Sequence, residues 1–255
     1  MTSRHSSKRP CFTPRENPEL EYAALAAYAI PSLYEKRIGR EARDVARYLE
    51  LAVEARGPVL DYGCGNGRVA LALARAGFDV WGVDRSRPML DDFERRLAAE
   101  PYDVVARARI VWGDMREVRL RRRFALVVAP CDTLLHLYTR ADVERFLARV
   151  KAHLEPGGRF VFDVQAPDFG AQSRRSRWRH YDAMHQILWL FVPGDADRVP
   201  LALRQYAPLE LETLLCHAGF GARFERVTFR KRETAGRYWV SCRVRRRPAP
   251  SARVG

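Results

Sequence analysis

Hydrophobic residues recur with two different spacings along the chain. Residues 40–55 carry apolar side chains at helical spacing, namely Val45, Tyr48, Leu49 and Ala52, and Gly57–Pro58 ends that predicted helix. From residue 58 onward, short apolar runs alternate with amphipathic stretches. The runs predict strands at 58–61, 79–84, 106–112, 124–129 and 159–165, and the stretches predict helices at 68–76, 86–100 and 139–154.

Strands that alternate with helices at this spacing are typical of right-handed crossovers and a parallel sheet. Ligands of such sheets bind at the carboxyl ends of the strands. We therefore expect an α/β fold with its binding site at that edge, and Ser86 as the cap of the second helix.

The pattern changes after residue 166. Residues 177–192 and 199–206 predict antiparallel strands, followed by a helix at 208–217 and a hairpin of 222–230 with 237–245. The insertion 166–207 is too short for its own core, so we expect it to form a small antiparallel cap over the cleft. Residues 1–20 predict a disordered basic tail, 21–247 a single domain and 248–255 a flexible C-terminus.

Composition narrows the class of protein. The chain has 255 residues, of which 47% are hydrophobic, and its longest apolar stretch, Ile187–Pro193, is only strand-sized, so no membrane partner is expected. Five dispersed cysteines without a CxxC motif suggest neither a zinc site nor a disulfide framework. A reducing, cytoplasmic location fits this cysteine usage best.

The net charge of +14 comes almost entirely from arginine, since the chain has four lysines. An anionic partner such as a nucleic acid is one interpretation of this charge. Solvated faces and tails of an arginine-biased protein are the interpretation we favour, because residues 107–123 interleave arginines with strand-like segments rather than aromatic residues.

The stretch VLDYGCGNGR, residues 59–68, places three glycines directly after a buried strand and Asp61. A dinucleotide loop follows the pattern GxGxxG, whereas here the third glycine arrives one residue early and Arg68 occupies the place of the dinucleotide glycine. The Asp61 carboxylate would repel a pyrophosphate and favour an ammonium group. The loop therefore fits a nucleoside with an amino-acid tail better than a dinucleotide.

Two further acids follow the next two strands. Asp84 closes the second strand, seventeen residues after Gly67, where a carboxylate can accept both ribose hydroxyls. Asp114 follows the third strand and can bond an adenine amino group, with Trp112 or Met115 along the ring. Each acid alone is as easily a turn or cap residue, but acids after three consecutive strands predict one nucleoside crevice.

With VLDYGCGNGR, WGVDRS, WGDMRE, FALVVAPCDTLLHL and LEPGGRFVFDV, the chain resembles the class I S-adenosylmethionine-dependent methyltransferases of the small-molecule type. The resemblance covers about residues 20–245 and is most specific within 58–165. It implies a doubly wound, Rossmann-like, seven-stranded, mostly parallel sheet of order 3-2-1-4-5-7-6, in which the C-terminal hairpin supplies strands six and seven. It also implies S-adenosylmethionine as the cofactor.

The resemblance assigns roles to individual residues. Asp61, Gly63 and Gly65 line the methionyl part, Asp84 holds the ribose, and Asp114 with Met115 frames the adenine. Asn66 replaces a common threonine and still offers a polar side chain. The remaining residues expected to bind the cofactor are Arg85, Met89, Gly113 and Pro130. No metal site is expected.

The segment APCDTLLHL, residues 129–137, lies beside the methyl acceptor in the family. It resembles the version in small-molecule methyltransferases, including those acting on sugar amines, where a histidine follows at the position of His136. We expect His136 to act as a base or to orient the acceptor, and Tyr34 to belong to an N-terminal lid; core packing is the alternative for both. Weaker candidates for the acceptor pocket are Tyr22, Gln165, Arg204 and Gln205.

The leading interpretation is a monomeric or homodimeric enzyme that methylates nitrogen or oxygen of a small-molecule acceptor. Adenine-N6 methyltransferases carry (N/D)PP(Y/F) where this chain has APCD, and Pro130–Cys131 matches the nucleophile motif of cytosine-C5 enzymes only superficially, so a nucleic-acid substrate is not expected. Two alternatives stay open. One is an RNA or protein methyltransferase that uses the arginine-rich surface, and the other is a non-catalytic cofactor-binding protein.

Overall fold

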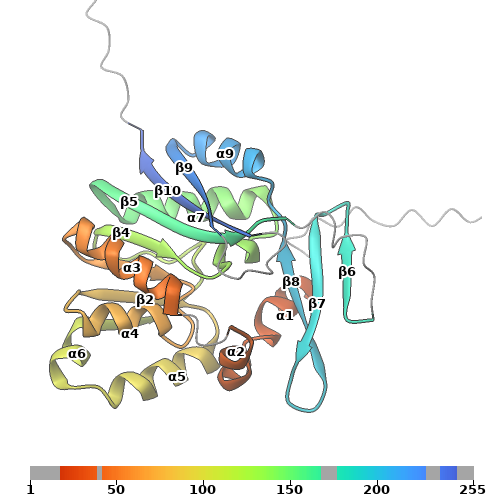
Figure 1. Cartoon of the computed structure of the whole chain (residues 1–255), viewed down its shortest axis with the longest axis horizontal. Coiled ribbons are helices and arrows are strands. Elements are labelled where there is room, and N and C mark those ends of the chain that lie inside the picture. The colour runs from red at the N-terminus through yellow and green to blue at the C-terminus, as the bar shows by residue number, and fades with distance from the viewer. Residues whose placement is uncertain (1–17, 39–41, 168–176, 228–235, 246–255) are drawn as a thin grey trace, which may run out of the picture.

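A seven-stranded sheet runs through the computed structural model, which describes residues 18–38, 42–167, 177–227 and 236–245 (Figure 1). Its order is β3-β2-β1-β4-β5-β10-β9. The first five strands are parallel, and β10 is antiparallel to both of its neighbours. The strands are β1 (Val59–Tyr62), β2 (Val80–Asp84), β3 (Ala108–Trp112), β4 (Phe124–Ala129), β5 (Leu154–Gln165), β9 (Phe220–Val227) and β10 (Arg237–Val244).

The predicted fold and strand order are confirmed, because β9 and β10 are the sixth and seventh strands of this sheet. The intervening numbers belong to the insertion, whose strands β6 (Arg179–Asp182), β7 (Ile187–Pro193) and β8 (Arg198–Arg204) form a separate antiparallel sheet.

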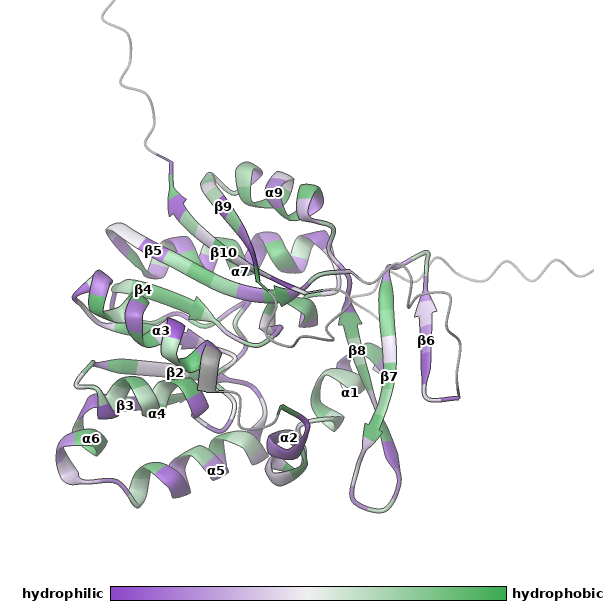
Figure 2. Ribbon diagram, in the orientation of Figure 1, coloured by the Kyte–Doolittle hydropathy of each residue, from purple (hydrophilic) through white to green (hydrophobic). Residues whose placement is uncertain are grey.

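Helices cover both faces of the main sheet. On one face, the core is shared with α3 (Ala42–Ala55), α4 (Arg68–Arg75) and α5 (Arg87–Ala98). On the other, it is shared with α7 (Arg140–His153) and α9 (Pro208–His217). Every residue of β4 is buried, and Figure 2 shows this strand as hydrophobic along its length, so β4 runs as a core strand beneath the site.

The insertion sheet packs against the N-terminal helix α1 (Pro18–Ala26), which Figure 1 shows beside β8. Together they form a small core of their own, made of Leu20, Ala23, Ala24, Tyr138, Ile187 and Ala202. Because α1 begins at Pro18, residues 18–20 are helical and do not belong to the tail predicted for 1–20. Residues 1–17 and the predicted flexible end at 248–255 lie outside the described residues.

Four local predictions need correction. The predicted strand 106–112 starts later, because α6 (Tyr102–Arg107) occupies its beginning. The strand predicted at 159–165 starts earlier, since β5 begins at Leu154. The predicted strand 177–192 is split into β6 and β7 by a turn in which Gln186 has a positive φ of 54°. Ser86 occupies the cap position of α5, yet its hydroxyl bonds the Tyr28 carbonyl at 3.5 Å instead of capping the helix.

No helix in the described ranges combines the length and apolar character that crossing a membrane requires.

Gly67 fixes the angle at which α4 leaves the glycine loop. It has φ +81°, and a Cβ at this position would lie 2.3 Å from the ring of Phe93 on α5. Replacing Gly67 with Ala therefore adds backbone strain to a steric clash. We expect the free energy of unfolding to fall by about 2–4 kcal/mol, which is about 5–10 °C in Tm at this chain length.

Gly77 provides the matched control, since its φ is +94° but nothing lies within 4 Å of an added Cβ. Gly77→Ala carries only the backbone strain and should cost about 1 kcal/mol. Equal losses of Tm in the two variants, measured by calorimetry, would show that the contact with Phe93 does not determine the position of α4.

Candidate functional site

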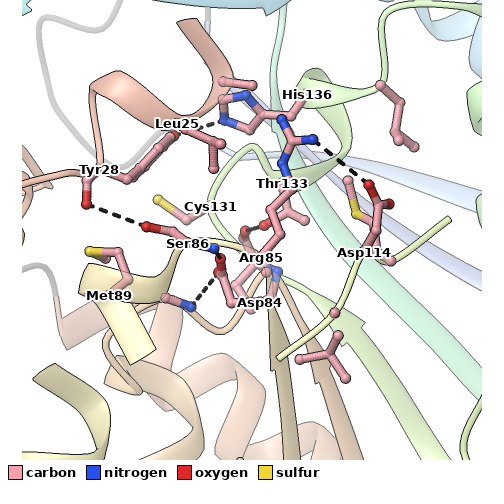
Figure 3. Close-up of a pocket in the computed structure, with 18 of the residues that line it drawn as sticks. Leu25, Tyr28, Asp84, Arg85, Ser86, Met89, Asp114, Cys131, Thr133 and His136 are labelled. Atoms are coloured by element: carbon pink, nitrogen blue, oxygen red, sulfur yellow. Dashed lines mark hydrogen bonds and ion pairs between the residues drawn. The ribbon is translucent and has the colours of Figure 1, made fainter. Parts of the chain in front are cut away.

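A pocket opens at the carboxyl ends of the central strands, beneath α1 and α2 (Pro31–Ile38). It encloses about 780 Å³ of space free of protein atoms, part of which is open solvent. Figure 3 shows residues from the N-terminal helix, the loops after β2 and β3 and the segment after β4 converging on this space.

Most of the predicted site residues share this pocket. Those that line it are Tyr34, Gly63, Gly65, Asp84, Arg85, Met89, Gly113, Asp114, Met115, Pro130 and His136. Asp61 and Asn66 are fully buried and lie outside the pocket lining. Of the weaker candidates, Tyr22, Gln165, Arg204 and Gln205 are not part of the lining either. The roles expected of all these residues stay predictions.

Asp84 joins the glycine loop to the second strand. Its two carboxylate oxygens accept hydrogen bonds from the backbone N–H groups of Gly65 and Ser86, each at 2.8 Å (Figure 3). Burial raises the pKa of this carboxyl group, while the two N–H groups oppose the rise. Each oxygen keeps a further lone pair, so the carboxylate can still accept hydroxyl donors from a ligand.

Asp61 is a buried acid whose two side-chain oxygens have no hydrogen-bond partner among the described residues. Burial raises its pKa to about 8, although the nearby Arg68 guanidinium opposes the rise. Arg68 itself forms a two-pronged ion pair with Asp44, at 2.7 and 2.5 Å. An unpaired carboxyl group next to the glycine loop is costly, and a cationic ligand group would relieve that cost.

Asn66 connects the glycine loop to the covering helix α2. Its amide nitrogen donates to Glu35 at 3.1 Å and to Asp92 at 3.2 Å. Arg96 contacts the same two acids. Asn66 therefore bonds the helices around the pocket in this structure and leaves the lining to its glycine neighbours.

Asp114 lies in a cluster of charges at the rim. Arg116 approaches both of its carboxylate oxygens, and Arg85 lies 3.7 Å away. Burial alone would raise the pKa of Asp114, but hydrogen bonds from Arg116 outweigh it, so the pKa is lowered. Glu21 of α1 binds Arg85 at 2.7 Å and lies 3.5 Å from Arg116. The same cluster thus ties the N-terminal helix to the loops after β2 and β3.

His136 occupies the wall formed after β4. It ends the short 3-10 helix η2 (Thr133–His136), and its Nε2 lies 2.7 Å from the hydroxyl of Tyr28. Burial, with Arg85 and Arg37 nearby, lowers the pKa of His136 to about 3, so the ring is neutral at ordinary pH. Its other nitrogen, Nδ1, has no hydrogen-bond partner within the described chain.

Tyr28 is a pocket residue that sequence reasoning missed. It packs edge-on against His136 and lies 5.7 Å from the Tyr34 ring, while the guanidinium of Arg37 covers both tyrosines. Burial is the main cause of its raised pKa, so its hydroxyl stays protonated. Its apolar neighbours in the sequence gave it the pattern of a core residue, and only the folded structure brings it to His136.

Cys131 also lines the pocket, but its chemistry differs from that of a catalytic thiol. Burial raises the pKa of Cys131 to about 12, and the carboxylates of Asp132 and Asp163 add to the shift. A nucleophilic cysteine needs the thiolate form. This thiol is protonated at neutral pH, which argues against a nucleophilic role for Cys131. In the described part of the chain, no group of acidic, histidine or cysteine side chains is arranged to hold a metal ion.

Comparison with known proteins identifies the central segment. Residues 59–158 match the family model described as a methyltransferase domain. The putative methyltransferase YqeM of Bacillus subtilis (strain 168) is 31% identical over 121 residues, covering 47% of this chain and 47% of the relative. The chain spans about half the length of the curated relatives it matches.

Solved structures extend the likeness beyond that segment. The CcbJ methyltransferase of Streptomyces caelestis superposes with a TM-score of 0.65 at 27% identity, covering 78% of this chain and 88% of that one. The glycopeptide N-methyltransferase MtfA in complex with sinefungin gives 0.61 at 27% identity, with coverage of 81% and 89%.

Proposed function

We propose that this chain, whose residues 59–158 match the model of a methyltransferase domain, binds S-adenosylmethionine and methylates nitrogen or oxygen of a small-molecule acceptor. One observation supports this most directly. A glycine loop with an unpaired buried acid, Asp61, adjoins a pocket whose wall carries two further acids, Asp84 and Asp114.

The residues present fit such a cofactor. Asp84 would hold the ribose hydroxyls and Asp114 the adenine amino group, while Asp61 lies near the part of the loop expected to hold the methionyl ammonium group. The loop leaves no room for larger residues at its start, because a Cβ on Gly63 would lie 2.5 Å from the Thr133 hydroxyl oxygen. When bound, the cofactor supplies an electrophilic methyl group on a sulfonium centre.

The protein's contribution to transfer is positioning and exclusion of water. Tyr28 and His136 offer polar atoms on a wall that is otherwise built from apolar residues, namely Ala24, Leu25 and Leu137. A histidine with a pKa of about 3 is a weak base, which favours the orienting role of His136 over abstraction of a proton from an ammonium group. The acceptor amine or hydroxyl would then be held by hydrogen bonds.

The test of this function has two steps. Calorimetry should detect binding of S-adenosylmethionine and S-adenosylhomocysteine by the purified chain, and no comparable binding of NAD or ATP. Incubation with methyl-labelled cofactor and a panel of small amines and alcohols should then label at least one of them. Binding of NAD or ATP in place of the sulfonium compound contradicts the cofactor. Tight cofactor binding with no labelled acceptor favours a non-catalytic protein.

The variant His136→Ala tests acceptor binding separately from cofactor binding. We expect His136→Ala to lower kcat/KM for the acceptor by about 10- to 100-fold, because the neutral ring no longer orients it. The Kd for S-adenosylhomocysteine should stay within about threefold, since His136 lies on the opposite side of the pocket from Asp84 (Figure 3). Full activity in this variant would leave His136 as a packing residue only.

We further propose a reducing, cytoplasmic setting, supported by the four cysteines in the described ranges, which are all free thiols. A monomer or a homodimer is expected, and light scattering distinguishes them. Several surface arginines are paired with acids, such as Arg122 with Asp79 and Arg140 with Glu144, which favours a small molecule over RNA as the partner. Binding of RNA that weakens steeply with salt would contradict this preference.

A further inference from the structure

The segment that joins β4 to η2 has an unusual backbone. Cys131 and Asp132 are consecutive non-glycine residues with positive φ, at 55° and 65°. This conformation is strained for residues other than glycine, so the surrounding structure has to hold it. The strain lies at the pocket wall, because Pro130, Cys131 and Thr133 all line the pocket.

Three backbone contacts with β5 hold this turn. The side chain of Asp163 accepts the N–H of Cys131 at 2.8 Å, and its main-chain oxygen accepts the N–H of Asp132 at 3.2 Å. In return, the Asp132 carboxylate accepts the N–H of Gln165 at 2.7 Å. The two carboxylates of Asp132 and Asp163 therefore fix the left-handed turn from both sides.

One arginine from β10, distant in the sequence, holds both carboxylates. Arg237 donates to Asp163 at 3.0 and 2.5 Å through Nε and Nη2, and to Asp132 at 2.8 and 3.2 Å through Nη2 and Nη1. The hydroxyl of Tyr48 donates to Asp163 at 2.6 Å and completes the set. Asp163 is 2% exposed, while Arg237 is 15% exposed, so water screens these contacts little.

The forked guanidinium group of Arg237 can bind both carboxylates at once. Two buried carboxylates so close together repel each other unless a cation lies between them. A lysine ammonium group carries the charge but is a single point, and it cannot reproduce four contacts to two acids. The β10–β5 pairing at Arg237 and Gln165 is made by the backbone, so the sheet itself does not require the arginine.

We propose that Arg237 is a positioning residue for the acceptor half of the pocket. It acts through Asp132 and Asp163, which set the turn that presents Cys131 and starts the short helix ending at His136. This inference rests on the proposed function. It assigns to β10, the last described strand along the chain, a role in positioning the acceptor that is not evident from the sequence.

Arg237→Lys is the test, and Arg159→Lys is its matched control. Arg159 lies on the neighbouring strand β5, is 17% exposed and pairs with Glu54 at 2.8 Å, but it is not part of the pocket lining. For each variant, three quantities are measured: the Kd for S-adenosylhomocysteine, kcat and KM for the acceptor, and hydrogen exchange of the amides in residues 130–137. The double variant Arg237→Gln with Asp132→Asn removes one charge of each sign, should Arg237→Lys fail to fold.

We expect Arg237→Lys to lower kcat/KM for the acceptor by about 10- to 100-fold and to speed exchange at Cys131 and Asp132, with cofactor Kd unchanged within about threefold. Arg159→Lys should change none of the three. A cofactor Kd that weakens in step with kcat/KM, or normal catalysis despite a loosened turn, overturns the inference.

Failure of the proposed function would look different. In that case the wild-type chain itself would bind no S-adenosylhomocysteine or label no acceptor. The exchange measurement requires neither cofactor binding nor an acceptor. An unchanged exchange rate in Arg237→Lys would by itself refute the inference that Arg237 holds the turn at Cys131 and Asp132.

Discussion

Replacing Asp84 with Ala is expected to abolish measurable binding of S-adenosylhomocysteine. The variant loses the carboxylate that would accept the ribose hydroxyls, and two hydrogen bonds to a charged group are worth about 3–6 kcal/mol together. That corresponds to about 10²- to 10⁴-fold in Kd. It also frees the N–H groups of Gly65 and Ser86, which loosens the adjoining glycine loop.

Asp79 offers a control next to the same strand. It lies just before β2, at the end remote from the pocket, and its exposed carboxylate pairs with Arg122 at 3.0 Å. Surface pairs of this kind contribute about 0–1 kcal/mol, so Asp79→Ala should leave the Kd unchanged. Isothermal calorimetry on both variants makes the comparison. If Asp84→Ala binds within threefold of the wild type, the ribose contact has been assigned to the wrong residue.

Asp61→Asn is expected to stabilise the free protein while weakening its cofactor affinity. The wild-type carboxyl group is buried without a partner, and its pKa of about 8 means that ionising it disfavours the folded state. The amide carries no charge and avoids this cost. The same change removes the partner for a ligand ammonium group, which should raise the Kd about 10- to 100-fold.

The stability difference between the wild type and Asp61→Asn depends on pH. Between the ordinary carboxyl pKa of 3.8 and the folded value of about 8, the folded protein holds more protons than the unfolded chain. Wild-type stability therefore falls with rising pH through this window, relative to Asp61→Asn, and the deficit is fully present above pH 8. Tm values of the two proteins should coincide near pH 4 and separate at pH 9. A separation at pH 9 with the wild type more stable would refute the unpaired acid.

Much of the sheet was predictable because its signals are local. The buried run 124–129 matches β4 residue for residue, and the glycines of the loop are required by backbone angles that other residues rarely adopt. The acids Asp84 and Asp114 follow strands that the apolar pattern already defines. Because the strands are parallel, their carboxyl ends lie at the same edge of the sheet. The sequence alone therefore predicts that both acids lie at one pocket.

The remaining features depend on contacts between distant segments. Tyr28 and His136 are 108 residues apart and meet only after the N-terminal helices fold over the sheet. Arg237 lies 105 residues after Asp132, in a strand whose sequence reads as an ordinary alternation. Asn66 resembled a ligand contact in sequence, yet the proximity of Glu35 and Asp92 gives its amide protein partners. Such pairings carry no periodic signal.

The shared core of α1 and the insertion sheet has a consequence for engineering. Leu20, Ala23 and Ala24 pack with Ile187 and Ala202 in one small core, so two segments about 160–180 residues apart behave as one module. Consider a chimera that takes the insertion from a relative but keeps the N-terminal helix of this chain. The residues of this shared hydrophobic core would then no longer match. Acceptor preference should therefore be transplanted by exchanging both segments together, with the glycine loop and its neighbouring strands kept from the host.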